Sequence, residues 1–266
     1  MTTGALIFAF NNESIDYVSM AAWSAKNIQR HLGIPVSLVT DTAVDNAVFD
    51  RVIYTANQQS TNTRHFSDVG TVTWHNLNRM DAYTLTPYRQ TLVLDADYVV
   101  ASNQLQAVLD SQEEFMCHRF AYDITGLNNF QGLNVFGKYN MPMWWATVMM
   151  FRNSERARLV FESMSMIRDN WTHYRNLYGN NTVTYRNDHA LSIALNIENG
   201  HTLETTDIAW SLASLTPEHQ LTQLEPDHYR IDYINSNNKS QWITLKNQDF
   251  HAMGKQQLGD IVANNS

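Results

Sequence analysis

Residues 91–100 read Thr-Leu-Val-Leu-Asp-Ala-Asp-Tyr-Val-Val. The aliphatic run at the start of this stretch predicts a buried strand, because strands covered on both faces of an α/β sheet are apolar throughout. Two acids follow it, Asp95 and Asp97, and only Ala96 separates them. An extended backbone would point both carboxylates to the same side. The stretch therefore predicts a buried strand that ends in a pair of acids facing one side.

The N-terminal part of the chain predicts a strand, a helix and a second strand. Residues 4–10 are apolar and β-prone, and the apolar residues after them recur at helical spacing. Gly33 is placed to end that helix, and residues 35–40 form the next apolar run. Such a βαβ unit implies parallel strands, with nucleotides bound beyond their carboxyl ends. The predicted fold class is α/β, a mixed and mainly parallel sheet flanked by helices.

The same patterns extend over the rest of the chain. A polar segment over 56–73 and a Gly- and Asn-rich segment over 121–140 are predicted as loops, the second lying over the site. One domain over residues 1–266 is expected, with a nucleotide-binding half at about 1–100 and an acceptor half at about 101–266. Further strands are predicted near 51–54, 114–118 and 144–151. Further helices are predicted over 77–85, 103–110 and 188–199, together with a long helix that is capped by Asn153 or Ser154 and extends to Trp171.

Composition limits the possible partners. The chain has 266 residues and a formal net charge of -8, which argues against a large surface for polyanions. Arginines over 152–175 lie beside aromatic residues and could contact phosphates and bases, although the acids among them fit a solvated helix face. The single cysteine, Cys117, predicts a buried inert thiol. No run is long enough to cross a bilayer and no leader is recognised, so we expect a cytoplasmic protein without a membrane partner.

Asp-Ala-Asp is by itself a weak signal for a metal, because a solvated strand end carries the same residues. Its position after a buried strand strengthens the signal, since charge at such a place normally demands a partner. Carboxylate oxygens suit Mg²⁺ or Mn²⁺, which complete their shell with water and substrate phosphates. A cation held there would act as a Lewis acid on a departing nucleoside diphosphate.

Residues 249–255 form a second polar element and read Asp-Phe-His-Ala-Met-Gly-Lys. The pairing of residues 94–97 with this late His-x-x-Gly-Lys resembles the GT-A glycosyltransferases, particularly those related to glycosyltransferase family 8. The family pattern usually continues with Pro-Trp, where this chain has Gln256 and Gln257. The resemblance implies a cation held by Asp95, Asp97 and His251, and a donor diphosphate approached by Ala96, Gly254 and Lys255. Without the resemblance, His251 fits an ordinary surface histidine.

Other segments resemble the same family. Residues 79–83 look like its Arg-containing helix, which implies that Arg79 contacts donor phosphate or sugar; a helix-surface arginine is the alternative. Residues 144–154 look like its acceptor-side strand, with Ala and Thr where the family often has Ser-Gly. Residues 187–189 look like the polar cluster beside the reacting sugar carbon, so Asp188 is the catalytic candidate, with helix capping as the alternative. Uridine and ribose are expected against Ala9, Phe10, Asn11 and Asp41.

These resemblances predict a metal-dependent glycosyltransferase that moves a sugar from a UDP-sugar to a hydroxyl acceptor, with retention favoured by family 8. Residues 5–12 and 185–192 also resemble viral members of this fold, some of which glycosylate hydroxymethylated cytosine in phage DNA. That resemblance implies modified DNA as an acceptor, a flipped base framed by residues 121–145, and the cytoplasm of a host cell. Saccharide and protein acceptors stay open as alternatives.

Two other classes of function fit Asp-x-Asp. A phosphatase of the haloacid dehalogenase type would use the first acid as nucleophile and the second as acid or base. The late position of the motif and Tyr98, where Thr or Val is usual, argue against it. In a non-catalytic nucleotide-binding module, the acids would only end the strand.

Overall fold

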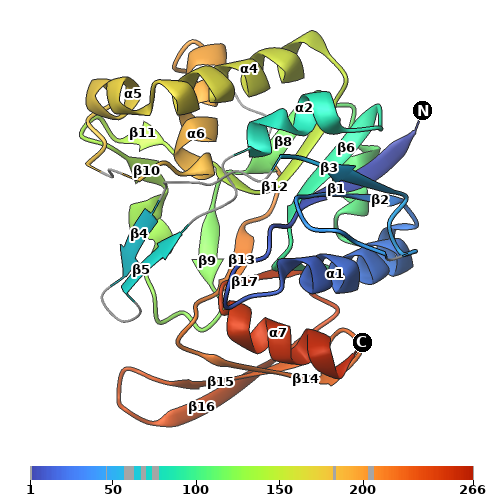
Figure 1. The fold of residues 1–266 in the computed structure, drawn as a ribbon. Helices are drawn as coiled ribbons and strands as arrows, with labels where there is room; N and C mark the ends of the chain where they lie inside the picture. Colours follow the sequence, from blue (N-terminus) through green and yellow to red (C-terminus); the bar gives the residue numbers. More distant parts are fainter. Residues whose placement is uncertain are drawn as a thin grey trace.

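The computed structural model describes residues 2–45, 47–56, 63–66, 70–73, 78–181, 184–202 and 207–265 (Figure 1). Its centre is a six-stranded sheet with the strand order β3-β2-β1-β6-β12-β8. The first four of these strands are parallel, and β12 runs antiparallel to both of its neighbours. The predicted α/β class is confirmed. The strands are β1 (Thr3–Phe8), β2 (Val36–Thr40), β3 (Arg51–Tyr54), β6 (Gln90–Asp95), β8 (Phe115–His118) and β12 (Trp145–Arg152).

Helices cover both faces of this sheet (Figure 1). Leu92 and Leu94 of β6 pack into the apolar cluster that contains α1 and α7, whereas Val93 packs into the cluster that contains α4 and α6. This alternation explains why residues 92–94, directly before Asp95, are all apolar. The helices are α1 (Tyr17–Leu32), α2 (Ala82–Leu85), α3 (Gln106–Asp110), α4 (Glu155–Asp169), α5 (Trp171–Leu177), α6 (Asn187–Glu198) and α7 (Lys255–Asn264).

Caps define the ends of two helices; the Gly33 end of α1 was predicted, and Ser154 was one of two predicted caps of α4. Asp16 caps α1 by accepting a hydrogen bond from the backbone N–H of Ser19, and Gly33 ends the helix with a φ of 65°. Ser154 caps α4 by accepting from the N–H of Ala157. The predicted long helix is divided at Asn170, which separates α4 from α5.

A second, four-stranded sheet has the order β7-β17-β13-β9. It consists of β7 (Tyr98–Val99), β9 (Ala121–Asp123), β13 (Leu212–Leu215) and β17 (Phe250–Ala252). Tyr98 of β7 lies opposite His251 of β17, and the N–H of Ala252 donates to the carbonyl oxygen of Asp97 at 2.9 Å. This pairing carries the C-terminal part of the chain to the end of β6, which no local pattern predicts.

Three further groups of elements complete the described structure. An antiparallel sheet contains β14 (Gln220–Glu225), β15 (His228–Ile234) and β16 (Ser240–Lys246), beside α7 (Figure 1). The short pairs are β4 (Thr63–Phe66) with β5 (Gly70–Thr73), and β10 (Val135–Phe136) with β11 (Met141–Pro142). Two 3-10 turns are η1 (Arg79–Asp81) and η2 (Phe130–Leu133).

Two predicted loops are wrong in part. The segment 56–73 contains the antiparallel pair β4 and β5, whose backbone pairing is independent of the polar composition that predicted a loop. The segment 121–140 contains β9, η2 and β10, which are too short for a periodic signal. No helix among the described residues is long and apolar enough to cross a membrane.

Two smaller predictions have an outcome. Cys117 is buried, and burial raises the pKa of its thiol well above the ordinary value, as expected of an inert cysteine. Arg158 on α4 lies in solvent and pairs with Glu155 and Glu162, one turn before and one turn after it. For that arginine the solvated helix face is confirmed.

Candidate metal and diphosphate site

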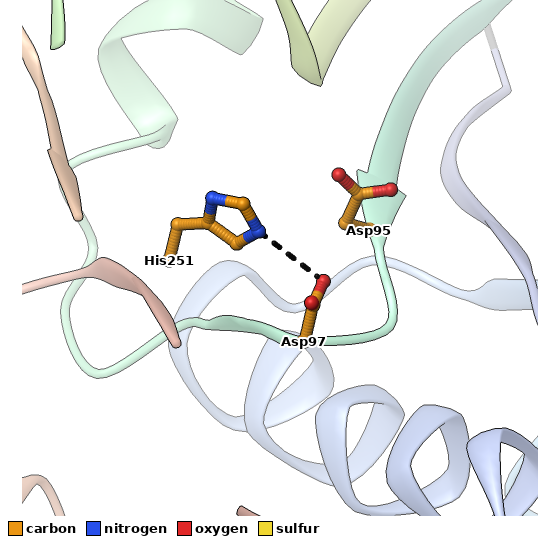
Figure 2. Close-up of side chains that lie close together, drawn as sticks. All are labelled: Asp95, Asp97 and His251. Atoms are coloured by element: carbon orange, nitrogen blue, oxygen red, sulfur yellow. Dashed lines mark ion pairs between the residues drawn. The ribbon is translucent and has the colours of Figure 1, made fainter. Parts of the chain in front are cut away.

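A turn brings the two acids of the Asp-Ala-Asp stretch together. Asp95 is the last residue of β6, Ala96 and Asp97 form a turn, and β7 follows at once. The prediction of an extended backbone between the acids is therefore wrong, although their carboxylates do face one region. One ligand atom each from Asp95, Asp97 and His251 lie within 4.8 Å of one another (Figure 2).

His251 completes the group from the second sheet. Its Nε2 lies 3.5 Å from Oδ1 of Asp97, and its side chain is 12% exposed. The alternative of an ordinary surface histidine is wrong. Nδ1 of the same ring is buried without a hydrogen-bond partner in the described part of the chain, so the contact to Asp97 is the polar contact that orients the ring.

Lys255 reaches the same acid from the start of α7. Its Nζ lies 2.7 Å from Oδ2 of Asp97, and the preceding residue, Gly254, is the N-cap of the helix. Burial alone would raise the pKa of Asp97, but Lys255 and His251 beside it hold that pKa well below the ordinary value. Asp97 is therefore an anion with two nitrogen groups around it.

Arg79 is buried behind the other acid. It is 2% exposed, and its guanidinium donates to the Asp95 carboxylate and to the carbonyl oxygen of Ala146. The alternative of a helix-surface arginine is wrong. Burial lowers the pKa of Arg79 to about 10 against the opposing influence of Asp188 and Asp97, which leaves it protonated at neutral pH. Its predicted contact with the donor stays a prediction.

Asp188 lies in the first turn of α6, whose N-cap is Arg186. Its Oδ1 accepts a hydrogen bond of 2.9 Å from the N–H of Ala146, and its Oδ2 lies 3.2 Å from the Arg186 guanidinium. The alternative of helix capping by Asp188 is wrong, because its carboxylate bonds to β12. Burial would raise the pKa of Asp188, but Arg186 and the Ala146 N–H lower it below the ordinary value.

The residues predicted to hold uridine and ribose follow β1 and β2. Phe8 at the end of β1 lies opposite Asp95 at the end of β6, so Ala9, Phe10 and Asn11 follow the strand that pairs with β6. Asp41 follows β2, the next strand along. The Asn11 side-chain oxygen accepts from the N–H of Val18, which holds this segment against α1. Their role in binding a nucleotide stays a prediction.

Two residues of this region were missed by the sequence analysis. Arg186 pairs with Asp188. Tyr17 is the first residue of α1, and burial raises its pKa. Tyr17 also lies close enough to the site for Lys255 to lower this pKa and for Asp97 to raise it. No spacing signal could have found Tyr17, because its place depends on how α1 packs beside β6 and α7.

The donor set fits a hard divalent cation. Two carboxylates and one imidazole suit Mn²⁺ or Mg²⁺; Asp95 ends β6, Asp97 lies in the turn after it, and His251 comes from β17 of the second sheet. Asp97 is 5% exposed and ionised, so it offers a carboxylate anion to an ion at this place, beside the positive charge of Lys255. Asp95, Asp97 and His251 are therefore the residues that would hold the ion.

No protein-family model matches the chain, and no curated protein sequence matches it. Solved structures of similar chain arrangement include the galactosyltransferase LgtC with donor and acceptor sugar analogues, at 12% identity and a TM-score of 0.48, covering 72% of this chain and 70% of that one. The apo form of mouse xyloside xylosyltransferase 1 gives 10% identity and a TM-score of 0.47, covering 81% and 88%.

The glycosyltransferase GlyE of Streptococcus pneumoniae TIGR4 gives 12% identity and a TM-score of 0.43, covering 79% of this chain. The matched part spans 46% of GlyE, less than half of that protein. All three scores lie below 0.5, so the function must be argued from the side chains of the site.

Proposed function

We propose that the chain is a metal-dependent glycosyltransferase of the GT-A type, which transfers a sugar from a UDP-sugar to a hydroxyl acceptor. The observation that carries the proposal is the convergence of Asp95, Asp97, His251 and Lys255 at the end of β6. Two acids and an imidazole suit a divalent cation, and an ammonium group beside them suits the phosphates that such a cation binds.

Positive charge is concentrated where the leaving group would develop negative charge. Asp95, Asp97 and His251 would hold Mn²⁺ or Mg²⁺, which supplies a Lewis acid for the departing diphosphate. Lys255 adds a positive charge at the start of α7, beside the proposed cation site, which would stabilise the diphosphate as it departs. Arg79 keeps the Asp95 carboxylate in place from the buried side.

Asp188 is proposed as the acid beside the reacting sugar. Its lowered pKa keeps it ionised at neutral pH, so it accepts hydrogen bonds from sugar hydroxyls and does not serve as a proton donor. The Ala146 N–H and Arg186 fix its two oxygens in place. Uridine and ribose would lie along Ala9–Asn11 and Asp41, in the nucleotide-binding half of a single domain.

The contact to Arg79 favours this function over a phosphatase. A haloacid dehalogenase-type enzyme would need the Asp95 carboxylate free for attack on phosphorus. Here that carboxylate accepts a hydrogen bond from the buried guanidinium of Arg79, which suits a metal ligand better than a nucleophile. A covalent phosphate on Asp95 after incubation with phosphomonoesters would support the phosphatase.

The test begins with binding and proceeds to turnover. Thermal-shift measurements with UDP, GDP and dTDP sugars, each with and without Mn²⁺, identify the donor. UDP release is then measured with saccharides, proteins and hydroxymethylated DNA as acceptors. We expect stabilisation by a UDP-sugar that depends on Mn²⁺. Stabilisation by GDP- or dTDP-sugars alone would contradict the uridine assignment, and stabilisation without turnover of any acceptor would favour a binding module.

A further inference from the structure

Lys255 stands at a place that its own helix does not favour. It is the first residue of α7, a helix of ten residues, and a cation at a helix N-terminus opposes the helix dipole. The ammonium group is explained instead by Asp97, whose Oδ2 lies 2.7 Å from Nζ. The Asp97 side chain is 7% exposed and that of Lys255 is 31% exposed, so solvent reaches the lysine side chain but hardly reaches the carboxylate.

Both oxygens of Asp97 are engaged in this arrangement. Oδ1 faces Nε2 of His251 at 3.5 Å, and Oδ2 faces Lys255. Asp95 and His251 lie with Asp97 in the group that fits a cation. An ion held by this group would share Asp97 with the ammonium group of Lys255, and two cations at one carboxylate repel each other.

We propose that Lys255 competes with the divalent cation for Asp97 in the nucleotide-free protein, and that a diphosphate relieves the competition by giving the ammonium group an anion of its own. The inference rests on the proposed function. It goes beyond that function because Lys255 would then couple the binding of the metal to the binding of the donor. Metal alone would bind weakly, and metal and nucleotide together would bind tightly.

The coupling is reciprocal. If UDP tightens Mn²⁺ binding by some factor, Mn²⁺ must tighten UDP binding by the same factor. Direct contacts between metal and diphosphate supply one part of that factor, and they do not need Lys255. Removing Lys255 should therefore reduce the factor without abolishing it, and its largest effect should appear with no nucleotide present.

The experiment measures the binding of Mn²⁺ alone, by electron paramagnetic resonance of the free ion, to the wild type and to Lys255→Met. Methionine keeps the length of the side chain and removes its charge. We expect Lys255→Met to bind Mn²⁺ about tenfold more tightly than the wild type without nucleotide. The matched control is Lys239→Met, which removes an exposed lysine between β15 and β16 and should leave the affinity unchanged.

The second measurement repeats both titrations with saturating UDP. The factor by which UDP increases the affinity for Mn²⁺ should be smaller in Lys255→Met than in the wild type. An unchanged or weaker affinity of Lys255→Met for Mn²⁺ alone, in a protein with wild-type circular dichroism and Tm, would overturn the inference and leave the proposed metal site intact. Failure of the wild type to bind Mn²⁺ even with UDP would instead overturn the proposed function.

Discussion

Asp95 and Asp188 are linked through one residue of β12, Ala146, with Arg79 as the bridge to Asp95. Arg79 donates to the Asp95 carboxylate and to the carbonyl oxygen of Ala146, and the N–H of Ala146 donates to Asp188 at 2.9 Å. The proposed metal ligand and the proposed sugar-side acid are therefore both positioned by the same buried residue, which lies near the start of β12. A site built in this way holds its geometry without help from a flexible loop.

Removal of the Arg79 side chain should be costly. Arg79→Met leaves the Asp95 carboxylate and the Ala146 carbonyl without their donor, and uncompensated buried groups of this kind cost about 3 kcal/mol or more. Urea denaturation should show that loss in the free energy of unfolding. Arg158→Met, which removes an exposed arginine of α4, should change the value by less than about 1 kcal/mol. Equal stability of the two variants would contradict the role of Arg79 as the buried anchor.

Asp97→Asn should abolish function while preserving the shape of the side chain. The amide removes the negative charge that Lys255 and His251 surround and that the cation needs. We expect sugar transfer to fall by at least about a hundredfold, and the Mn²⁺-dependent rise in Tm to disappear. Chelation of the metal should have the same effect on the wild type. Asp232→Asn, at a partly exposed pair with Arg230, serves as the control. Full turnover by Asp97→Asn would exclude this site.

The stability of the protein should fall in mild acid because of His118. Burial lowers the pKa of His118 to about 4, although its hydrogen bond to the carbonyl oxygen of Trp210 opposes the effect. The pKa of His118 is lower in the folded protein than in the unfolded chain. As the pH falls, the unfolded chain therefore binds a proton at about pH 6.5, whereas the folded protein binds it only at about pH 4.

From pH 7 to pH 5 this histidine alone should reduce the free energy of unfolding by about 2 kcal/mol. His118→Asn keeps a donor for Trp210 and removes the titrating ring. The variant should therefore lose less stability than the wild type between these two pH values, as measured by urea denaturation. A parallel decline of the two proteins would show that other groups cause the acid sensitivity.

Gly4→Ala should destabilise the central sheet. A Cβ at Gly4 in β1 would overlap with the ring of Tyr88, whose hydroxyl is hydrogen-bonded to that of Ser37 in β2. The ring cannot move without breaking that bond, so we expect a loss of about 1–3 kcal/mol, measured as a lower Tm. In the double variant Gly4→Ala with Tyr88→Ala, the added methyl group should cost almost nothing beyond the loss of the ring. A normal Tm for Gly4→Ala alone would contradict the contact.

Local patterns predicted the elements whose signal is strong within a few residues. The apolar run before Asp95 predicted β6, and Gly33 predicted the end of α1. The helix predicted over 77–85 is present as η1 and α2 from Arg79 to Leu85, whereas the antiparallel pair of β4 and β5 lies in a segment that was predicted as a loop. Their residues are few or polar, and long-range contacts decide their conformation.

By itself the sequence determined the fold class and the buried strand before Asp95, and it marked Asp95 and Asp97 as candidates for a hard cation, because burial and ligand chemistry belong to residue types; His251 was added by the family resemblance. Only the tertiary structure decided that His251 and Lys255 face Asp97 and that Arg79 is buried behind Asp95. These contacts depend on the pairing of β17 with β7 and on the packing of helices around the sheet. Polar side chains have the same local pattern whether they lie in solvent or meet across such a pairing.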